Sequence, residues 1–277
     1  MARKFLRDVP ALIGLVIVFL ALLIAVFAPL VAPHPQDAST AHLAQRLRPP
    51  SWAAPFGTDN LGRDILSRVI LGTRSALIVP LTVVGLAVSI GVPLGLLAGW
   101  RRTWLSFLIM RLTDVFLAVP QLVLALAFTQ LLGAGLRSAM LALALTYWPF
   151  FTRIVYAETR RLRAGLFVDA LRCLGASPAR ILCAHVLPNM LSPIIVRATI
   201  GMGFTILVAA MLGFLGMGAS PPDPDWGLAI AESRGYLPQA WWFSTFPGLA
   251  ILVVVLGFNL LGDGLRDIAD PRLRRSR

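Results

Sequence analysis

DALRCLGASPARILCAHVLPN, Asp169–Asn189, interrupts an apolar chain with a polar segment that contains arginines, a glycine and a proline. Gly175 is well placed for the left-handed position that follows the end of a helix. Ser177 and Pro178 then supply an N-cap and a first helical residue, and this second helix is expected to stop near Leu187-Pro188. The segment therefore predicts two short helices joined by a tight turn, with the arginines facing water.

Long uncharged runs lie on both sides of this segment. Of the 277 residues, 57% are hydrophobic and only 14% are charged, which is not typical of a soluble domain. A membrane-spanning helix needs about 20 predominantly apolar residues. The runs lie between Asp8 and Asp37, Arg74 and Arg101, Asp114 and Arg137, Arg137 and Arg153, Arg197 and Asp223, and Arg234 and Asp263.

These runs predict an all-α integral membrane protein with about six transmembrane helices and a cytoplasmic helix-turn-helix loop. The fourth run is short unless Arg153 lies at the membrane edge and reaches water. The first run exceeds the h-region of a signal peptide, which is about 7–15 residues, and so is interpreted as a membrane anchor.

The formal charge of +12 does not indicate nucleic-acid binding, because the basic residues are arranged as in membrane proteins. The arginine bias places both termini and the Glu158–Pro188 loop in the cytoplasm. Residues 33–74 weaken the bias, since they carry five arginines and are expected outside. Within them, an amphipathic helix capped by Thr58 or Asp59 is predicted to lie at the membrane surface, with Asp64 and Arg68 as an i, i+4 pair.

The sequence lacks the residues that several enzyme classes require. Lys4 is the only lysine, so a phosphate-binding loop of the GxxxxGK[ST] type is excluded, and no HExxH or GxSxG motif is present. Cys173, Cys183 and His185 make at most a weak metal site. We therefore expect no enzyme activity and no cofactor or metal in this chain.

One ionisable pair is predicted near the inner end of the third span. Arg111 and Asp114 are three residues apart, and an ionisable group at membrane depth is a functional candidate. The two interpretations are a structural ion pair at the interface and a pair on the transport path. Pro120 is expected to kink the same helix.

The polar segment resembles the EAA loop of binding-protein-dependent ABC importer permeases, whose pattern is E-A-A, three residues, G, nine residues, I-x-L-P. Asp169 and Ala170 stand for the first two positions, and Gly175 and Leu187-Pro188 are kept. Leu171 and His185 depart from the pattern. FGTDNLGRDILSR (56–68), PPDPDWG (221–227) and FNLLGDGLRDIADPRLR (258–274) are similar to the second permease subunit of dipeptide, oligopeptide and nickel importers.

The resemblance implies half of a translocation pathway in the bacterial inner membrane. Its expected partners are a homologous permease, two cytoplasmic ATPases that hold ATP and Mg²⁺, an extracytoplasmic binding protein and membrane lipid. Di- or oligopeptides are the expected cargo; nickel or a metal chelate is the first alternative, and an ion-driven secondary transporter is the alternative of another class. The coupling residues it implies are Asp169, Ala170, Leu171, Arg172, Gly175, Ala176, Ser177, Ile181, His185, Leu187 and Pro188.

The expected organisation has four parts. Residues 1–32 form the cytoplasmic N-terminus and first span, and residues 33–74 form a periplasmic loop with the amphipathic helix. Residues 75–263 form the core permease domain with five spans and the coupling loop at about 156–190. Residues 264–277 form a basic cytoplasmic tail.

Overall fold

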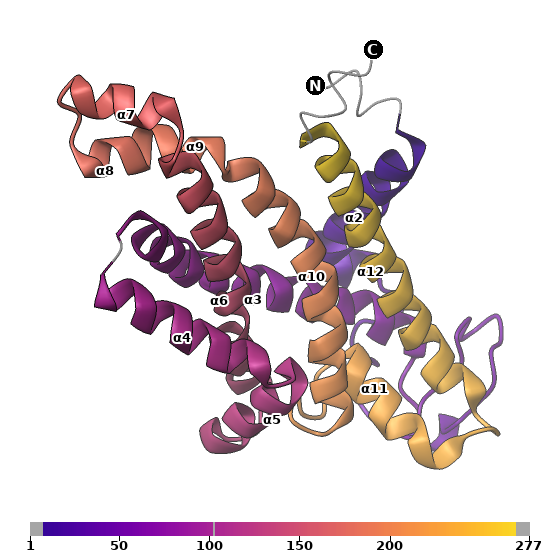
Figure 1. The fold of residues 1–277 in the computed structure, drawn as a ribbon. Helices are drawn as coiled ribbons and strands as arrows, with labels where there is room; N and C mark the ends of the chain where they lie inside the picture. Colours follow the sequence, from indigo (N-terminus) through magenta and orange to yellow (C-terminus); the bar gives the residue numbers. More distant parts are fainter. Residues whose placement is uncertain (1–7, 102, 270–277) are drawn as a thin grey trace.

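The computed structural model describes residues 8–101 and 103–269, and every regular element in these ranges is a helix (Figure 1). Five helices are long and apolar enough to cross a membrane. This confirms the predicted all-α membrane class. The five are α2 (Val9–Val31), α3 (Ile65–Trp100), α6 (Leu136–Arg163), α10 (Leu191–Phe214) and α12 (Trp241–Ala269).

The third predicted span is broken rather than kinked. α4 (Trp104–Ala118) and α5 (Gln121–Leu132) meet at an angle of 97° around Pro120. Proline disfavours helical geometry at the residue before it, and Val119 is extended with φ −94° and ψ 134°. The chain therefore has six spans only if this bent pair counts as one.

The core is built on close contact between α3 and α6. Gly91, Gly95 and Gly99 are four residues apart and form one stripe on α3, facing α6. A Cβ at Gly95 would lie 2.7 Å from the Cβ of Val155, so only glycine allows this spacing. Small residues are the usual means by which membrane helices approach closely.

α2 and α12 form a second packed pair beside this core. A Cβ at Gly14 would lie 2.8 Å from the carbonyl oxygen of Gly257, so the two backbones nearly touch. Val18 on α2 and Phe258 on α12 are buried in the same cluster as Ile206 of α10. The first span is therefore packed onto the rest of the bundle within this chain.

The predicted amphipathic surface helix is wrong in two respects. Helix α3 begins at Ile65, with Asp64 as N-cap accepting from Ser67 N at 2.8 Å, and it continues without a break into the second span. The predicted polar face is buried, because Arg63, Asp64 and Arg68 face the protein. The predicted boundary between residues 74 and 75 therefore falls inside α3.

Two short helical elements, α11 (Trp226–Ser233) and the 3-10 turn Arg234–Tyr236, lie near the start of α12. Another 3-10 turn, Leu43–Gln45, lies in the segment between α2 and α3. The polar segment forms α7 (Leu166–Cys173), α8 (Pro178–Arg180), a π-helical turn (Ile181–Val186) and α9 (Leu187–Asn189).

The two ends of the bundle carry different elements. Helices α7 and α8 lie at the end where α2 begins and α12 finishes, and α11 lies at the opposite end (Figure 1). The basic residues predicted at the termini, in residues 1–7 and 270–277, lie outside the described residues.

Replacing Gly95 by alanine is expected to destabilise the fold by about 1–3 kcal/mol, the usual cost of overpacking. The matched control is Gly85→Ala, because Gly85 lies on the same helix and a Cβ there meets nothing within 4 Å. Thermal aggregation of the detergent-solubilised protein, followed by size exclusion, measures both variants. Equal midpoints for the two variants would contradict the tight α3–α6 interface.

Candidate functional site

The turn predicted at Gly175 is present. Gly175 has φ +79°, its N–H donates to Arg172 O at 2.9 Å, and Ala176 N–H donates to Leu171 O at 3.0 Å. These two bonds define a Schellman motif, which satisfies the last carbonyls of α7. Ser177 then accepts from Arg180 N at 3.3 Å, which confirms the predicted N-cap.

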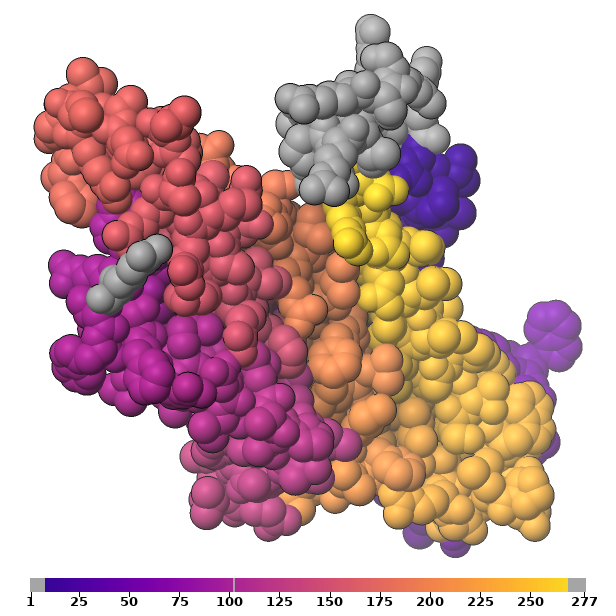
Figure 2. Space-filling model, viewed as in Figure 1, coloured from indigo at the N-terminus to yellow at the C-terminus, as the bar shows by residue number. Residues whose placement is uncertain are grey.

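The segment Leu166–Asn189, hereafter called the coupling segment after the role that the resemblance implies, has an inner and an outer face. Val168, Ile181 and Val186 are buried in the main core. Leu166 and Leu174 are 87% and 82% exposed, although both are large and apolar. Figure 2 shows the segment projecting from the body of the molecule. Its outer face is thus apolar in part and is covered by nothing in the described residues.

The predicted coupling residues divide between these faces. Ile181 is buried, so it supports the segment from inside and is not available for contact with a partner. Partly buried are Leu171, Ala176, His185 and Leu187. Exposed are Asp169, Ala170, Arg172, Gly175, Ser177 and Pro188, with Asp169 and Arg172 forming an ion pair at 3.0 Å.

The coupling segment is attached to the end of α3. The Cζ atom of Arg172, within the segment, lies 5.2 Å from the centroid of the Trp100 ring, and that of Arg163, at the end of α6, lies 5.8 Å from it. Arg163 also donates to the Trp100 carbonyl oxygen. Helix α6 ends at Arg163, and α7 starts at Leu166. The segment therefore contacts α3 through Arg172 and is joined to α6 by residues 164 and 165.

The predicted Arg111–Asp114 pair is not formed. Asp114 pairs with Arg153 on α6, while the guanidinium of Arg111 lies 4.9 Å from the ring centroid of Phe107. The sequence spacing suggested a contact within one helix, whereas the packing of α4 on α6 brings a different arginine to the carboxylate. Both side chains are about half exposed in the isolated chain.

The opposite end of the bundle holds a buried ion network that the sequence did not predict. Asp59 is fully buried, and its carboxylate accepts from Arg63 Nε at 2.5 Å and lies 3.6 Å from Arg68 Nε. Arg63 Nη2 also pairs with Glu232 of α11 at 2.9 Å. Arg68 donates to the carbonyl oxygen of Ala38 at 2.7 Å. The network thus joins the segment before α3, the start of α3 and α11.

A sequence signal for this network existed in the arginines at 63 and 68. Helical periodicity from residue 58 onward predicts a water-facing position for both. Asp59 instead lies in a turn, and its Oδ1 accepts from the N–H groups of Leu61 and Arg63, both at 2.9 Å. Glu232 is 169 residues from Arg63, and only the tertiary fold brings the two together.

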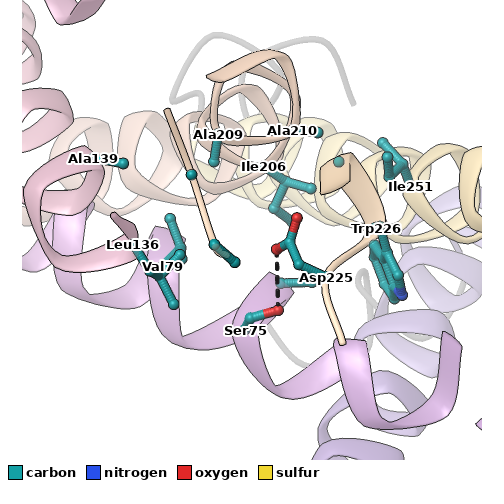
Figure 3. A pocket seen from close by; sticks show the side chains of 14 residues that line it. Ser75, Val79, Leu136, Ala139, Ile206, Ala209, Ala210, Asp225, Trp226 and Ile251 are labelled. Carbon is teal, nitrogen blue, oxygen red and sulfur yellow. Dashed lines mark hydrogen bonds between the residues drawn. The ribbon is translucent and has the colours of Figure 1, made fainter. Parts of the chain in front are cut away.

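A small cavity of about 30 Å³ lies beside α11 (Figure 3). Asp225 caps α11 by accepting from Leu228 N at 3.0 Å, and its other oxygen lies 3.3 Å from Ser75 Oγ. Burial raises the pKa of the Asp225 carboxyl, although these hydrogen bonds oppose the rise. The cavity is too small for a peptide, so Asp225 is a structural cap in this conformation.

The structure is a bundle of helices long and apolar enough to span a membrane, with a projecting helix-turn-helix at one end (Figure 1). The chain belongs to the family described as "Binding-protein-dependent transport system inner membrane component", which it matches over residues 91–275. Residues 1–50 match the "N-terminal TM domain of oligopeptide transport permease C". The chain is therefore an inner-membrane permease subunit of an ABC importer, as the resemblance implied.

Several transport permease proteins align with nearly the whole of this chain. It is 43% identical to the dipeptide transport system permease protein DppC of Alkalihalophilus pseudofirmus, covering 98% of this chain and 89% of that one. It is also 43% identical to the di/tripeptide permease protein DppC of Pseudomonas aeruginosa, covering 99% and 92%. It is 40% identical to the glutathione permease protein GsiD of Pectobacterium atrosepticum, covering 98% and 90%.

A solved structure shows the same fold at low sequence identity. The chain resembles the inward-facing MetNI methionine ABC transporter with a TM-score of 0.61 and 22% identity. The match covers 73% of this chain and 96% of that one.

Replacing Asp59 by asparagine tests the buried network. Asparagine keeps the oxygen that caps the turn but removes the charge, which leaves Arg63 buried with one fewer partner and is expected to cost about 3–5 kcal/mol. The control is Asp37→Asn, since Asp37 pairs with His42 at an exposed site and its loss costs little. Membrane abundance and trypsin sensitivity of residues 33–64 measure the effect. Normal abundance and trypsin resistance of the Asp59 variant would contradict it.

Proposed function

We propose that this chain forms half of the translocation pathway for di- or oligopeptides and couples to separate ATPases through the coupling segment. The observation that carries the proposal is the projecting segment with its exposed leucines, Leu166 and Leu174. Exposed apolar surface of this kind marks a protein-binding site. The peptide cargo is supported by the names of relatives that align with nearly the whole chain.

The partners follow from the permease family. A homologous permease completes the pathway, two ATPases bind ATP and Mg²⁺ below it, and a binding protein docks at the end that carries α11. We place the coupling segment and both termini in the cytoplasm. Nickel or metal-chelate cargo is less favoured, because the matched relatives are named for peptides or glutathione.

A secondary transporter driven by ions is not favoured either. Such transporters place buried carboxylates near the membrane midplane. Asp114, the carboxylate considered for that role, is about half exposed and paired with Arg153.

The contacts of the coupling segment suggest how ATPase closure reaches the spans. The segment continues directly into α10 and is joined to α6 through residues 164 and 165. Its Arg172 lies on Trp100 at the end of α3. A force on the outer face is therefore distributed over three long helices, which then rock between inward- and outward-open states.

Labelling of the two native cysteines tests the orientation. Cys173 and Cys183 are both free and exposed on the coupling segment, so a membrane-impermeant maleimide is expected to label them only after spheroplasts are permeabilised. The control replaces both by serine and adds Trp52→Cys, because Trp52 is fully exposed between α2 and α3. That variant is expected to react in intact spheroplasts, and the reverse pattern would overturn the orientation.

Replacing Gly175 by valine tests the coupling role. A positive φ strains a β-branched residue by about 1–3 kcal/mol, yet a Cβ at Gly175 meets nothing within 4 Å of this chain. We expect near-normal membrane insertion, loss of ATP-driven peptide uptake and weaker co-purification of the ATPase.

A matched control is available at the other end of α10. Gly216 has the same φ of +79°, the same open surroundings and the same turn geometry, with Met217 N donating to Leu212 O at 2.8 Å. Gly216→Val carries the same strain without touching the coupling segment, so it is expected to retain the ATPase. Equal recovery of the ATPase with both variants would refute the coupling role.

A further inference from the structure

Arg197 is the one charged residue of α10, and it lies within an apolar membrane-spanning helix. By the helical rise it is about 9 Å from the first residue of α10. Arginines within spans are costly and usually face a bundle interior or a water-filled path. No acidic side chain in residues 8–101 and 103–269 forms an ion pair with Arg197.

The contacts of Arg197 are with aromatic rings of α6. Its Cζ lies 4.8 Å from the ring centroid of Phe150 and 5.7 Å from that of Tyr147. Ring faces attract the cation but do not supply an ordinary hydrogen-bond acceptor. The buried Nε of Arg197 has no hydrogen-bond partner in the described chain. The guanidinium therefore keeps donors available for an acceptor.

Tyr147 supplies a second unpaired donor at the same place. Its side chain is 1% exposed, and its hydroxyl is buried without a hydrogen-bond partner among the described residues. The hydroxyl lies against Gly201, one helical turn from Arg197, where any Cβ would collide with it. A buried hydroxyl without a partner costs about 1–3 kcal/mol, so its retention here calls for a functional explanation.

We propose that Arg197 and Tyr147 bind the terminal carboxylate of the peptide cargo between α6 and α10. A carboxylate accepts two hydrogen bonds from an arginine and can accept a third from a hydroxyl. Phe204, which is 47% exposed and stacks on Tyr147 at 6.5 Å, adds an apolar wall for the neighbouring part of the peptide. This inference rests on the proposed peptide cargo.

The proposed carboxylate site lies between two helices, α6 and α10, whose relative movement opens and closes it. Helices α6 and α10 contact each other (Figure 1). Tyr147 and Phe150 of α6 lie beside Arg197 of α10. In the present conformation Gly201 covers the Tyr147 hydroxyl. Movement of α10 relative to α6 exposes this hydroxyl next to Arg197, so the carboxylate gains its third hydrogen bond only in one of the two states.

The test uses the complete importer in proteoliposomes, with ATP-driven uptake of a labelled tripeptide and of its C-terminal amide. Arg197→Gln is expected to lower uptake of the free acid about tenfold or more, and to lower uptake of the amide much less. Tyr147→Phe is expected to lower acid uptake about two- to fivefold. The matched control is Arg111→Gln, because Arg111 is another span arginine that contacts a ring, and it lies outside the site.

A photo-crosslinking measurement tests the site independently if the binding protein does not accept the C-terminal amide of the tripeptide. A tripeptide with a benzoylphenylalanine at its C-terminus is expected to crosslink to α6 and α10 during turnover, and Arg197→Gln is expected to abolish this. An unchanged crosslink, or equal loss of acid and amide uptake, would overturn the site while leaving the peptide cargo intact. Absence of any peptide uptake by the wild-type importer would instead overturn the cargo itself, and the site with it.

Discussion

The close contact between α3 and α6 is the constraint on which the rest of the structure depends. Three glycines at a spacing of four residues leave no side chain between the helices, so the bulky residues of α6 pack directly on the α3 backbone. Thr152 Oγ1 adds a hydrogen bond to the Gly91 carbonyl oxygen at 3.2 Å. Lipid provides no hydrophobic drive for helix association, so such van der Waals contact must supply the stability.

This rigid pair separates two ends with different physical properties. At one end, buried charges around Asp59 hold the segment that precedes α3 against helix α11. A desolvated ion network of this kind tolerates little rearrangement. At the other end, the coupling segment is held by a small apolar core and by guanidinium contacts on Trp100. In the proposed function, the end with the buried ion network docks the binding protein and the projecting end contacts the ATPase.

Between the two ends, the ionisable groups within the spans differ in whether a partner neutralises them. Asp114 and Arg153 satisfy each other across α4 and α6, which leaves no net charge at that point. Arg197 is different, because its neighbours are rings and its charge is not neutralised within the described chain. The aromatic neighbours of Arg197 limit the energetic cost of keeping an unneutralised guanidinium within a span.

The sequence by itself determined the membrane class, the turn at Gly175, the cap at Ser177 and the family, because each depends on local composition or on fixed spacing. The tertiary structure decided which charges meet. Asp59 and Glu232 are far apart in the chain, and Arg153 rather than Arg111 reaches Asp114. Helical periodicity cannot predict a turn such as the one at Asp59, nor the size of the 97° bend at Pro120. Contacts between separate helices depend on how closely their backbones approach, and that distance is a property of the folded bundle alone.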